Sequence, residues 1–447
     1  GSGAGRGQQA VQCRGSGSGL RYQLRDNRRG AVLAVWMNSE KNVGVKRKMS
    51  REKEHKKIGN QSVRFSHRPY FIGRGNIVGQ KEGEGPLASC FDEILTDDMY
   101  GEKSWEKAEC KMLEGAMEKA LRRAELTKEE IDIMLSGDLV NQIMSSSFTA
   151  RDLHIPFLGL YGACSTMTES LVVGSMLIDG GFARKILAGA SSHFCTAERQ
   201  FRMPVEHGNQ RPPSAQWTAT AAGAAVLSDE PRTLPNGRAI RAIEATVGKV
   251  IDAGVKDANQ MGSAMAPAAV DTLLNHLQDT GRDIDDYDLI VTGDLGFIGR
   301  DIMKDLLVDA GLDSQKVNAR YDDCGTMLFS RDQDVHGGGS GCGCSAAVLT
   351  GSLLPRMDAR GQMEPHHLRA DGRAALADLH HAGREHPRHR ARDQFGGGID
   401  GVYMGVSDWG RVLCGRTDSF RYDTADRAAD LGDFCAAWCA AAGCAAL

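Results

Sequence analysis

Two segments of the chain share a pattern at a constant offset of 156 residues, and this repeat constrains the fold more than any other feature. Residues 129–139 read Glu-Glu-Ile-Asp-Ile-Met-Leu-Ser-Gly-Asp-Leu, and residues 285–295 read Asp-Asp-Tyr-Asp-Leu-Ile-Val-Thr-Gly-Asp-Leu. Each segment follows an amphipathic helical pattern and contains an apolar run typical of a buried strand. The shared Asp, Gly, Asp and Leu favour duplication over chance. The repeat therefore predicts two similar α/β halves packed face to face, with a site where they meet.

The composition is that of an ordinary globular protein. The chain has 447 residues, a formal net charge of −4 and 41% hydrophobic residues, which is enough for two domains. No apolar run approaches the roughly 18 residues of a transmembrane helix, and the first residues do not resemble a signal peptide. Twelve cysteines lack metal-ligand or secretory spacing, which favours free thiols in a reducing compartment. We therefore expect neither a membrane span nor a bound metal.

Composition also divides the chain into four regions. Residues 1–56 are rich in Gly, Arg and Lys and lack periodicity, so we expect a disordered basic tail. Such a tail is either simply solvated or attracted to an anionic membrane or nucleic acid. Residues 57–240 and 241–357 alternate strand-like and helical patterns and form the two expected halves. Residues 358–447 have a different texture and form an aberrant tail.

The first half contains the clearest secondary-structure patterns. Apolar periodicity and residue type predict helices over residues 105–124 and about 165–179, and strands over 131–136, 157–161, 186–190 and 224–227.

Cys164 stands after one of these strands, at the expected start of a helix. A thiol there has three possible roles that the pattern alone does not separate. The helix dipole can lower its pKa and make it a nucleophile. The same helix start can bind a carboxylate or phosphate without chemistry, or the residue can be a small member of the core.

A nucleophile needs a base, and His193 is the best candidate because it directly follows the strand at 186–190. The alternative for His193 is an ordinary surface-loop histidine. Arg199 and Arg202 follow, and they either offer positive charge to an anionic ligand or serve as surface residues.

Five motifs in one order resemble the stage V sporulation protein AD family of endospore-forming bacteria, over about residues 58 to 357. They are Gly-Ala-Cys-Ser-Thr at 162–166, Thr-Ala-Glu-Arg-Gln-Phe-Arg at 196–202, Met-Gly-Ser-Ala-Met-Ala-Pro-Ala-Ala at 261–269, Asp-Asp-Cys-Gly at 322–325, and Gly-Gly-Ser-Gly-Cys-Gly-Cys-Ser-Ala at 338–346.

The resemblance implies a thiolase-like fold, in which two βαβαβαββ halves form five layers in the order α-β-α-β-α. In thiolases and ketoacyl synthases, a cysteine at the position of Cys164 attacks an acyl thioester with histidine or asparagine partners from the second half. This chain departs from that pattern. The strand at 289–291 runs into Thr-Gly-Asp-Leu where a histidine is expected, and residues 337–345 contain cysteines in place of Gly-His-Pro. We therefore expect a binding pocket with no catalytic residues, the alternative being an acyltransferase that uses Cys164.

The resemblance further implies binding of dipicolinic acid, pyridine-2,6-dicarboxylate, and its movement through a channel during sporulation and germination. The implied partners are integral membrane proteins of the same stage V sporulation operon, with a peripheral location at the forespore or spore inner membrane. By analogy with thiolases we expect a homodimer, and we expect no nucleic acid partner. No cofactor is expected, although calcium can accompany the ligand.

The expected ligand-binding residues come from both halves: Cys164, Ser165, His193, Asp138, Asn141, Asp294 and Cys342. Helix-start N–H groups and polar side chains suit a dianion. The carboxylates of Asp138 and Asp294 would repel a bare dianion. They fit the site if calcium accompanies the ligand or if they position the groups that donate to it.

The tail from about residue 358 does not continue a thiolase-like pattern. Residues 358–395 contain six histidines and no strand-like apolar run. Shifting the frame by one base permits a reading close to Trp-Asn-Arg-Ile-Thr-Phe-Val-Pro-Thr-Gly-Ala-Leu-Leu, which resembles the expected end of the family. We therefore hypothesise a frameshift near residue 358, which removes the last strands of the second half and one pocket wall. An independently confirmed open frame through 447 would contradict this hypothesis.

Overall fold

The computed structural model describes residues 55–201, 211–232, 239–257, 259–360 and 401–406, all within one structural unit that begins at His55. Residues 1–54 of the expected basic tail and most of the aberrant tail lie outside the described residues, as does Arg202.

A large mixed sheet forms the core of the first half, and strands from residues 241–247 and 401–406 join it. Its strand order is β1-β2-β9-β3-β8-β6-β4-β5, and β13 pairs with β9 beside this path. The strands are β1 (Lys57–Ile58), β2 (Ser62–Arg64), β3 (Tyr70–Val78), β4 (Ile133–Gly137), β5 (Phe157–Gly159), β6 (Lys185–Ser192), β8 (Ala221–Ser228), β9 (Arg241–Val247) and β13 (Gly401–Val406). β6 and β8 are buried almost throughout and consist of small and apolar residues, because helices cover both of their faces.

The outer face of this sheet is covered by α2 (Trp105–Ala124) and α3 (Met144–Leu153). The Ser104 hydroxyl accepts a hydrogen bond from the Lys107 N–H and so caps α2. An apolar stripe that includes Met112, Leu113 and Met117 packs on the sheet. Glycine at positions 73 and 75 of β3 lets α2 come close, since a side chain there would collide with helix carbonyls.

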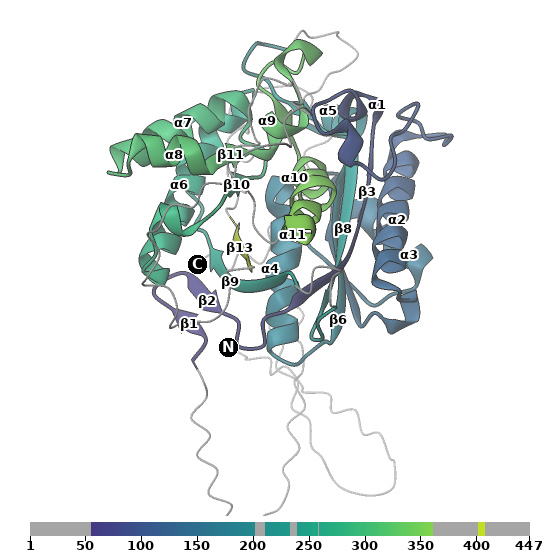
Figure 1. The fold of residues 1–447 in the computed structure, drawn as a ribbon. Helices are drawn as coiled ribbons and strands as arrows, with labels where there is room; N and C mark the ends of the chain where they lie inside the picture. The colour runs from purple at the N-terminus through teal and green to yellow at the C-terminus, as the bar shows by residue number, and fades with distance from the viewer. Residues whose placement is uncertain (1–54, 202–210, 233–238, 258, 361–400, 407–447) are drawn as a thin grey trace, which may run out of the picture. The chain divides into compact units, whose positions relative to one another are not determined.

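The inner face carries the buried helices that join the two halves. They are α4 (Thr166–Asp179) and a second helix that runs from α10 (Cys342–Val348) through a π-turn (Leu349–Leu353) into α11 (Leu354–Arg360). Gly223 on β8 lies against Ala346 of α10, where a Cβ would meet the Ala346 carbonyl. Figure 1 shows α4, α10 and α11 between the large sheet and the elements of the second half.

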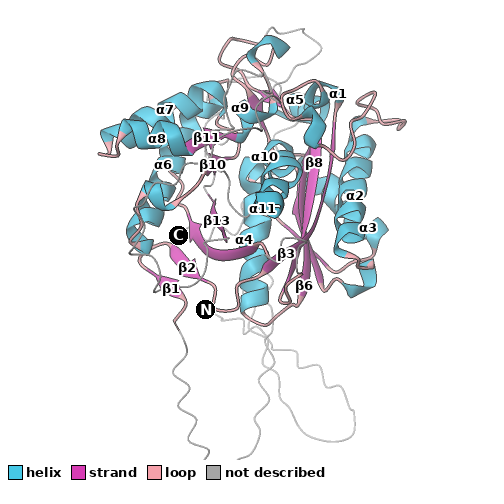
Figure 2. Ribbon diagram, viewed as in Figure 1, coloured by secondary structure: helices cyan, strands magenta, loops and turns pink. Residues whose placement is uncertain are grey.

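The second half contains the short parallel pair β10 (Ile290–Thr292) and β11 (Tyr321–Asp323). Its core joins residues of α6, α7 and β10, with Met265, Met303 and Leu307 buried among them. Figure 2 shows these helices on the far side of β10 and β11 from the inner helices. The remaining elements are α1 (Gln80–Gly83), α5 (Phe194–Phe201), α6 (Met261–Thr280), α7 (Gly296–Asp309), α8 (Ser314–Arg320), α9 (Cys324–Leu328), β7 (Trp217–Thr218) and β12 (Gly339–Ser340).

The structure confirms the predicted duplication and the α/β fold class. α2 and α6 both have 20 residues and begin 156 residues apart. Each precedes a short 3-10 turn with a capping box, Thr127 with Glu130 and Asp283 with Asp286. Each turn leads into a parallel strand, β4 or β10, that pairs with the next strand along. The predicted strands differ from the observed ones only at their ends, and α4 starts one residue later than expected, after a 3-10 turn.

Candidate functional site

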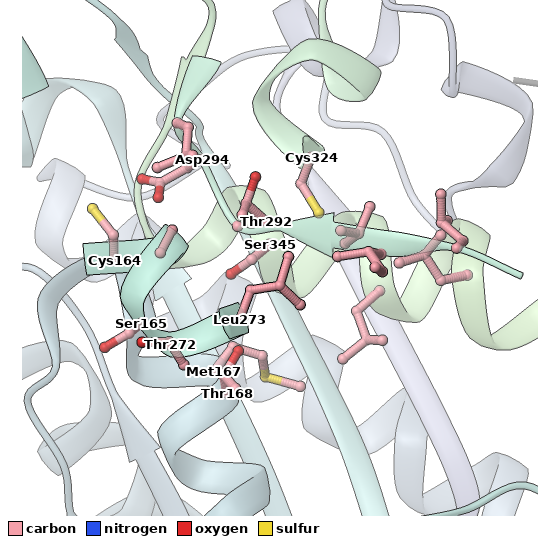
Figure 3. Close-up of a pocket in the computed structure, with 18 of the residues that line it drawn as sticks. Cys164, Ser165, Met167, Thr168, Thr272, Leu273, Thr292, Asp294, Cys324 and Ser345 are labelled. Carbon is pink, nitrogen blue, oxygen red and sulfur yellow. The ribbon is translucent and has the colours of Figure 1, made fainter. Parts of the chain in front are cut away.

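A cavity of about 320 Å³ lies between the inner helices and the second half (Figure 3). Its lining comes from α4, α6, β10, the loop after β10, and the helix that runs from α10 to α11. Most of the lining is apolar: Met167, Leu171, Met265, Ala269, Leu273, Ile290, Val291, Leu349, Leu353 and Met357. The described part of this lining contains no Lys or Arg, so no positively charged side chain of these types is there to attract an anion.

Cys164 lies on the cavity wall in a 3-10 turn that immediately precedes α4. The preceding residue, Ala163, has a φ of 47°, in the left-handed region that a non-glycine residue rarely adopts. Burial, the neighbouring charge of Asp294 and a hydrogen bond to Asp294 raise the pKa of the Cys164 thiol well above its usual value. The thiol therefore keeps its proton at neutral pH, despite its place at a helix start.

Asp294 follows β10 and also lines the cavity. Its Oδ2 accepts a hydrogen bond of 2.7 Å from the Gly341 N–H, in the turn that begins α10. Burial raises the pKa of Asp294, while the hydrogen bonds from Cys164 and Gly341 oppose that rise. Figure 3 shows the Asp294 and Cys164 side chains at the same side of the cavity. This carboxyl thus joins the loop after β10, the start of α4 and the start of α10.

The Asp294 loop is positioned by a second buried carboxyl, which sequence reasoning missed. Asp323 accepts hydrogen bonds from the Thr292 hydroxyl at 2.6 Å and from the N–H groups of Leu295 and Gly296 at 2.8 and 2.9 Å. Burial is the main reason that the pKa of Asp323 rises to about 7. The Asp-Asp-Cys-Gly motif, which begins within β11, is the signal from which this role follows.

His193 and Asn141 are not among the residues that line this cavity. His193 is fully buried, and its Nε2 lies 2.8 Å from the Asp98 carbonyl oxygen. Burial lowers the pKa of His193, so its ring is neutral at physiological pH. The contact with Asp98 connects the end of β6 to the loop that precedes α2. Asn141 is exposed and accepts a hydrogen bond of 2.6 Å from Gln200.

Asp138 and Cys342 are both buried outside the cavity. Asp138 accepts hydrogen bonds from the N–H groups of Val140 and Ser146, the latter at 2.7 Å in the first turn of α3. The Cys342 thiol donates to the Ser191 carbonyl oxygen at 2.9 Å. Neither side chain is part of the cavity lining. Of the seven expected site residues, the cavity therefore brings together Cys164, Ser165 and Asp294.

His276 is the histidine that lines the cavity, and the sequence interpretation overlooked it. Its Nδ1 lies 2.7 Å from the Thr246 hydroxyl and its Nε2 lies 2.8 Å from the Tyr287 hydroxyl. Burial lowers its pKa, so the ring is neutral at physiological pH. A histidine within the apolar face of residues 261–280 was the available signal.

The site therefore contains a protonated thiol beside a carboxyl. A nucleophilic cysteine needs a cationic or basic partner that stabilises the thiolate, whereas a carboxylate beside the sulfur disfavours it. Across the described residues, no group of three or more His, Cys, Asp or Glu side chains is arranged to hold a metal ion. None of the described helices has the length and apolar character that crossing a membrane requires.

Comparisons with known proteins agree in assigning a family. The family model for stage V sporulation protein AD (SpoVAD) matches residues 59–372. Stage V sporulation protein AD of Bacillus subtilis (strain 168) is 47% identical over 302 residues, which are 68% of this chain and 87% of that protein.

Similar solved structures include an OleA variant from Xanthomonas campestris, with 14% identity, a TM-score of 0.45 and coverage of 66% of this chain and 92% of that one. The 3-oxoacyl-[acyl-carrier-protein] synthase III from Aquifex aeolicus has 12% identity, a TM-score of 0.41 and the same two coverages. The family match, which spans most of the chain, shows that this protein belongs to the stage V sporulation protein AD family and acts in sporulation.

Proposed function

We propose that this protein is a non-enzymatic component of the channel that moves dipicolinic acid during sporulation and germination, and that it binds dipicolinic acid directly. Integral membrane proteins of the same stage V sporulation operon hold it at the forespore or spore inner membrane, where it is peripheral. It acts as a homodimer and has no nucleic acid partner. Family membership supports the role in sporulation. The contact between Cys164 and Asp294 is the observation that supports a non-enzymatic function.

The chemistry of that contact opposes acyl transfer. Attack on a thioester requires a thiolate, and in this site a thiolate would face the Asp294 carboxylate in a buried environment. Two like charges so close and so little solvated are unfavourable. A protonated thiol is instead a neutral hydrogen-bond donor, which suits the carboxylate of a ligand.

The ligand's second carboxylate needs further donors. The N-terminus of α4, a helix of 14 residues that starts beside Cys164 and Ser165, supplies backbone N–H groups and a favourable dipole. Calcium bound together with dipicolinate would allow Asp294 to stay ionised, because oxygen ligands suit Ca²⁺. Calcium would thus enter the site together with dipicolinate, as part of the ligand, and would not be a resident cofactor.

Isothermal titration of the full chain with dipicolinate, with and without calcium, tests the binding function. Isophthalate, benzene-1,3-dicarboxylate, is the control because it keeps both carboxylates and lacks the ring nitrogen. We expect saturable dipicolinate binding that isophthalate reproduces only weakly. A folded chain that shows no heat with dipicolinate under either condition contradicts the proposal and leaves a purely structural role.

The acyltransferase alternative makes a separate prediction. Incubation with acyl-CoA followed by mass spectrometry should show no acyl adduct on Cys164, because the thiol is protonated. An adduct on Cys164 would establish the enzymatic alternative instead.

A further inference from the structure

A second polar region of the cavity is formed by His276 of α6 and by Tyr287, which directly follows the 3-10 turn after α6. Both residues are almost fully buried, with exposed fractions of 6% and 7%. The hydrogen bonds that join the His276 ring to the hydroxyls of Thr246 and Tyr287 belong to a longer chain of polar groups. This chain determines where the proton of His276 lies.

The direction of the chain is fixed at one end by Asp279. The Asp279 carboxylate accepts a hydrogen bond of 2.9 Å from the Ser62 hydroxyl, and it also accepts hydrogen bonds from the backbone N–H groups of residues 60–62. A hydroxyl has one proton to donate, and Ser62 donates its proton to this carboxylate. The Thr246 hydroxyl, whose oxygen lies 2.8 Å from that of Ser62, must therefore donate to the Ser62 oxygen.

The same reasoning assigns the tautomer of His276. Because the Thr246 hydroxyl donates to Ser62, its oxygen accepts from His276 Nδ1, which carries the proton of the neutral ring. Nε2 is then an acceptor, and the Tyr287 hydroxyl donates to it. Arg282 also forms a hydrogen bond with the Tyr287 hydroxyl, and a guanidinium can only donate. The chain thus runs from a guanidinium to a carboxylate, and His276 lies within it.

Charged groups on several segments act on the His276 ring. Burial has the largest effect and lowers the pKa of His276; Glu244 of β9 and Asp279 of α6 act to raise it, and Arg282 acts to lower it. Arg64 of β2 does not act on Glu244 alone, because Glu244 also pairs with Arg282. The other titratable residues of the described lining, besides Tyr287, are Cys164, Asp294 and Cys324.

An anion bound in this cavity would need a compensating positive charge, because the lining is mainly apolar and an unpaired buried charge is costly. Among the described lining residues, His276 is the one whose side chain can become cationic near neutral pH. A proton on Nε2 would make both ring nitrogens donors, with Nδ1 still bonded to Thr246. Nε2 would then donate to the Tyr287 oxygen, and the hydroxyl proton of Tyr287 would be released for another acceptor.

We propose that His276 and Tyr287 form a proton-coupled binding site for a carboxylate of the cavity ligand. When the carboxylate binds, His276 takes up one proton from solvent on Nε2, and Tyr287 turns its hydroxyl proton from Nε2 to the ligand oxygen. This inference rests on the proposed function, since it takes the ligand to be an organic carboxylate. The protonated ring supplies a counter-charge that does not depend on calcium.

Nitrogen-15 NMR of the histidine side chains in the full chain measures the tautomer and the protonation of His276, and the signal lost in His276→Gln identifies the ring. The probe is benzoate, which combines an apolar ring with one carboxylate and stays ionised above about pH 6. We expect Nδ1 to carry the proton without benzoate, and both nitrogens to carry protons near pH 6.5 with saturating benzoate. Calorimetric titration in two buffers of different ionisation enthalpy should give an uptake of close to one proton. Because such coupling is reciprocal, benzoate affinity should rise as pH falls.

Two variants separate the parts of the site. Tyr287→Phe removes the hydroxyl that turns to the ligand, and it should weaken benzoate binding by on the order of tenfold. Thr246→Val keeps the shape of the side chain and removes the acceptor of Nδ1, so the free ring should no longer hold its proton exclusively on Nδ1. Tyr100→Phe is the matched control, because the Tyr100 hydroxyl donates to Glu93 at 2.6 Å outside the cavity. It should keep the benzoate affinity and the proton uptake of the unsubstituted chain.

The proposal is overturned if benzoate leaves the His276 signals unchanged, if it binds without proton uptake, or if the free ring carries its proton on Nε2. These measurements on the unsubstituted chain decide the matter even where a variant does not fold. Dipicolinate binding that leaves His276 neutral would overturn this site and keep the proposed function. Benzoate-linked protonation of His276 without any binding of dipicolinate would keep this site and contradict the proposed function.

Discussion

The most informative single contact in this protein is the one between Cys164 and Asp294. A cysteine at a helix start is commonly read as an activated nucleophile, because the dipole favours the thiolate. Here burial and the adjacent carboxyl act in the opposite direction and raise the pKa of the thiol. In this protein, burial and the neighbouring carboxyl outweigh the effect of the helix start on the Cys164 thiol.

Asp294→Asn removes the negative charge beside the sulfur, so it should lower the pKa of Cys164 and speed its alkylation by iodoacetamide at neutral pH. Alkylation rates across pH, followed at Cys164 by mass spectrometry, measure this effect. Cys195 is an internal control, since its pKa rises to about 11 mainly through burial. Equal alkylation profiles for Cys164 in the two proteins would show that Asp294 does not control the thiol.

Cys164→Ser keeps the size and hydrogen bonding of the side chain and should largely retain dipicolinate binding. Cys164→Leu adds bulk to a packed site, which costs about 1–3 kcal/mol and weakens binding by on the order of tenfold to a hundredfold. Titration of both purified variants, and the dipicolinate content of spores that carry them, are the measurements. A folded Ser variant whose spores are as empty as those of a deletion strain would mean that Cys164 performs chemistry.

At the scale of elements, the beginning of α10 depends on a glycine. Gly341 has φ 95° and ψ 156°, a conformation that is essentially restricted to glycine. A Cβ at this position would lie 2.9 Å from the Ser192 hydroxyl oxygen. The same residue donates its N–H to Asp294, so the backbone of α10 and the candidate site share this turn.

Gly341→Ala should therefore destabilise the protein by about 1–3 kcal/mol through backbone strain and a further amount through the clash with Ser192. Gly181→Ala is the matched control, because Gly181 also has a positive φ, 75°, but its Cβ would enter open space. Urea unfolding of both variants measures the free energy of unfolding. If both variants lose the same free energy of unfolding, the role assigned to the Gly341 turn is contradicted.

At the scale of the whole molecule, buried carboxyls make stability depend on pH. Burial raises the pKa values of Glu82 and Glu109 to about 8 and that of Asp323 to about 7. In the folded state these groups hold their protons to higher pH than in the unfolded state. Between the unfolded values near 4 and the raised values, the folded state binds more protons, so the free energy of unfolding falls as pH rises.

The chain should consequently unfold at lower urea concentration at about pH 8 than at about pH 6. Glu109→Gln keeps the size of the side chain and removes one titrating group, so its stability should decline less over the same range. Urea midpoints for the two proteins at both pH values measure the difference. If the urea midpoint of the unsubstituted protein is instead higher at the higher pH, other titrating groups control the pH dependence of its stability.

The sequence alone was sufficient to predict the duplication, the fold class and the family. These features rest on local periodicity and on motifs in a constant order, and neither depends on how distant side chains meet. Helix 105–124 was predicted at its observed bounds because strong helix formers and a uniform apolar stripe act within one element. The lining of the candidate cavity was anticipated in part, since Cys164, Ser165 and Asp294 lie at element ends that border it, while their role in binding stays a prediction.

Only the tertiary structure decided which polar residues share the cavity. His193 and Asp138 occupy strand ends as expected, but packing turns their side chains to a loop carbonyl and to backbone N–H groups. The sequence marks His276 as a polar residue within the apolar face of α6, but it does not show which residues face that side chain. Contacts of this kind join residues far apart in the chain, and burial then sets their pKa values, so no local pattern contains them.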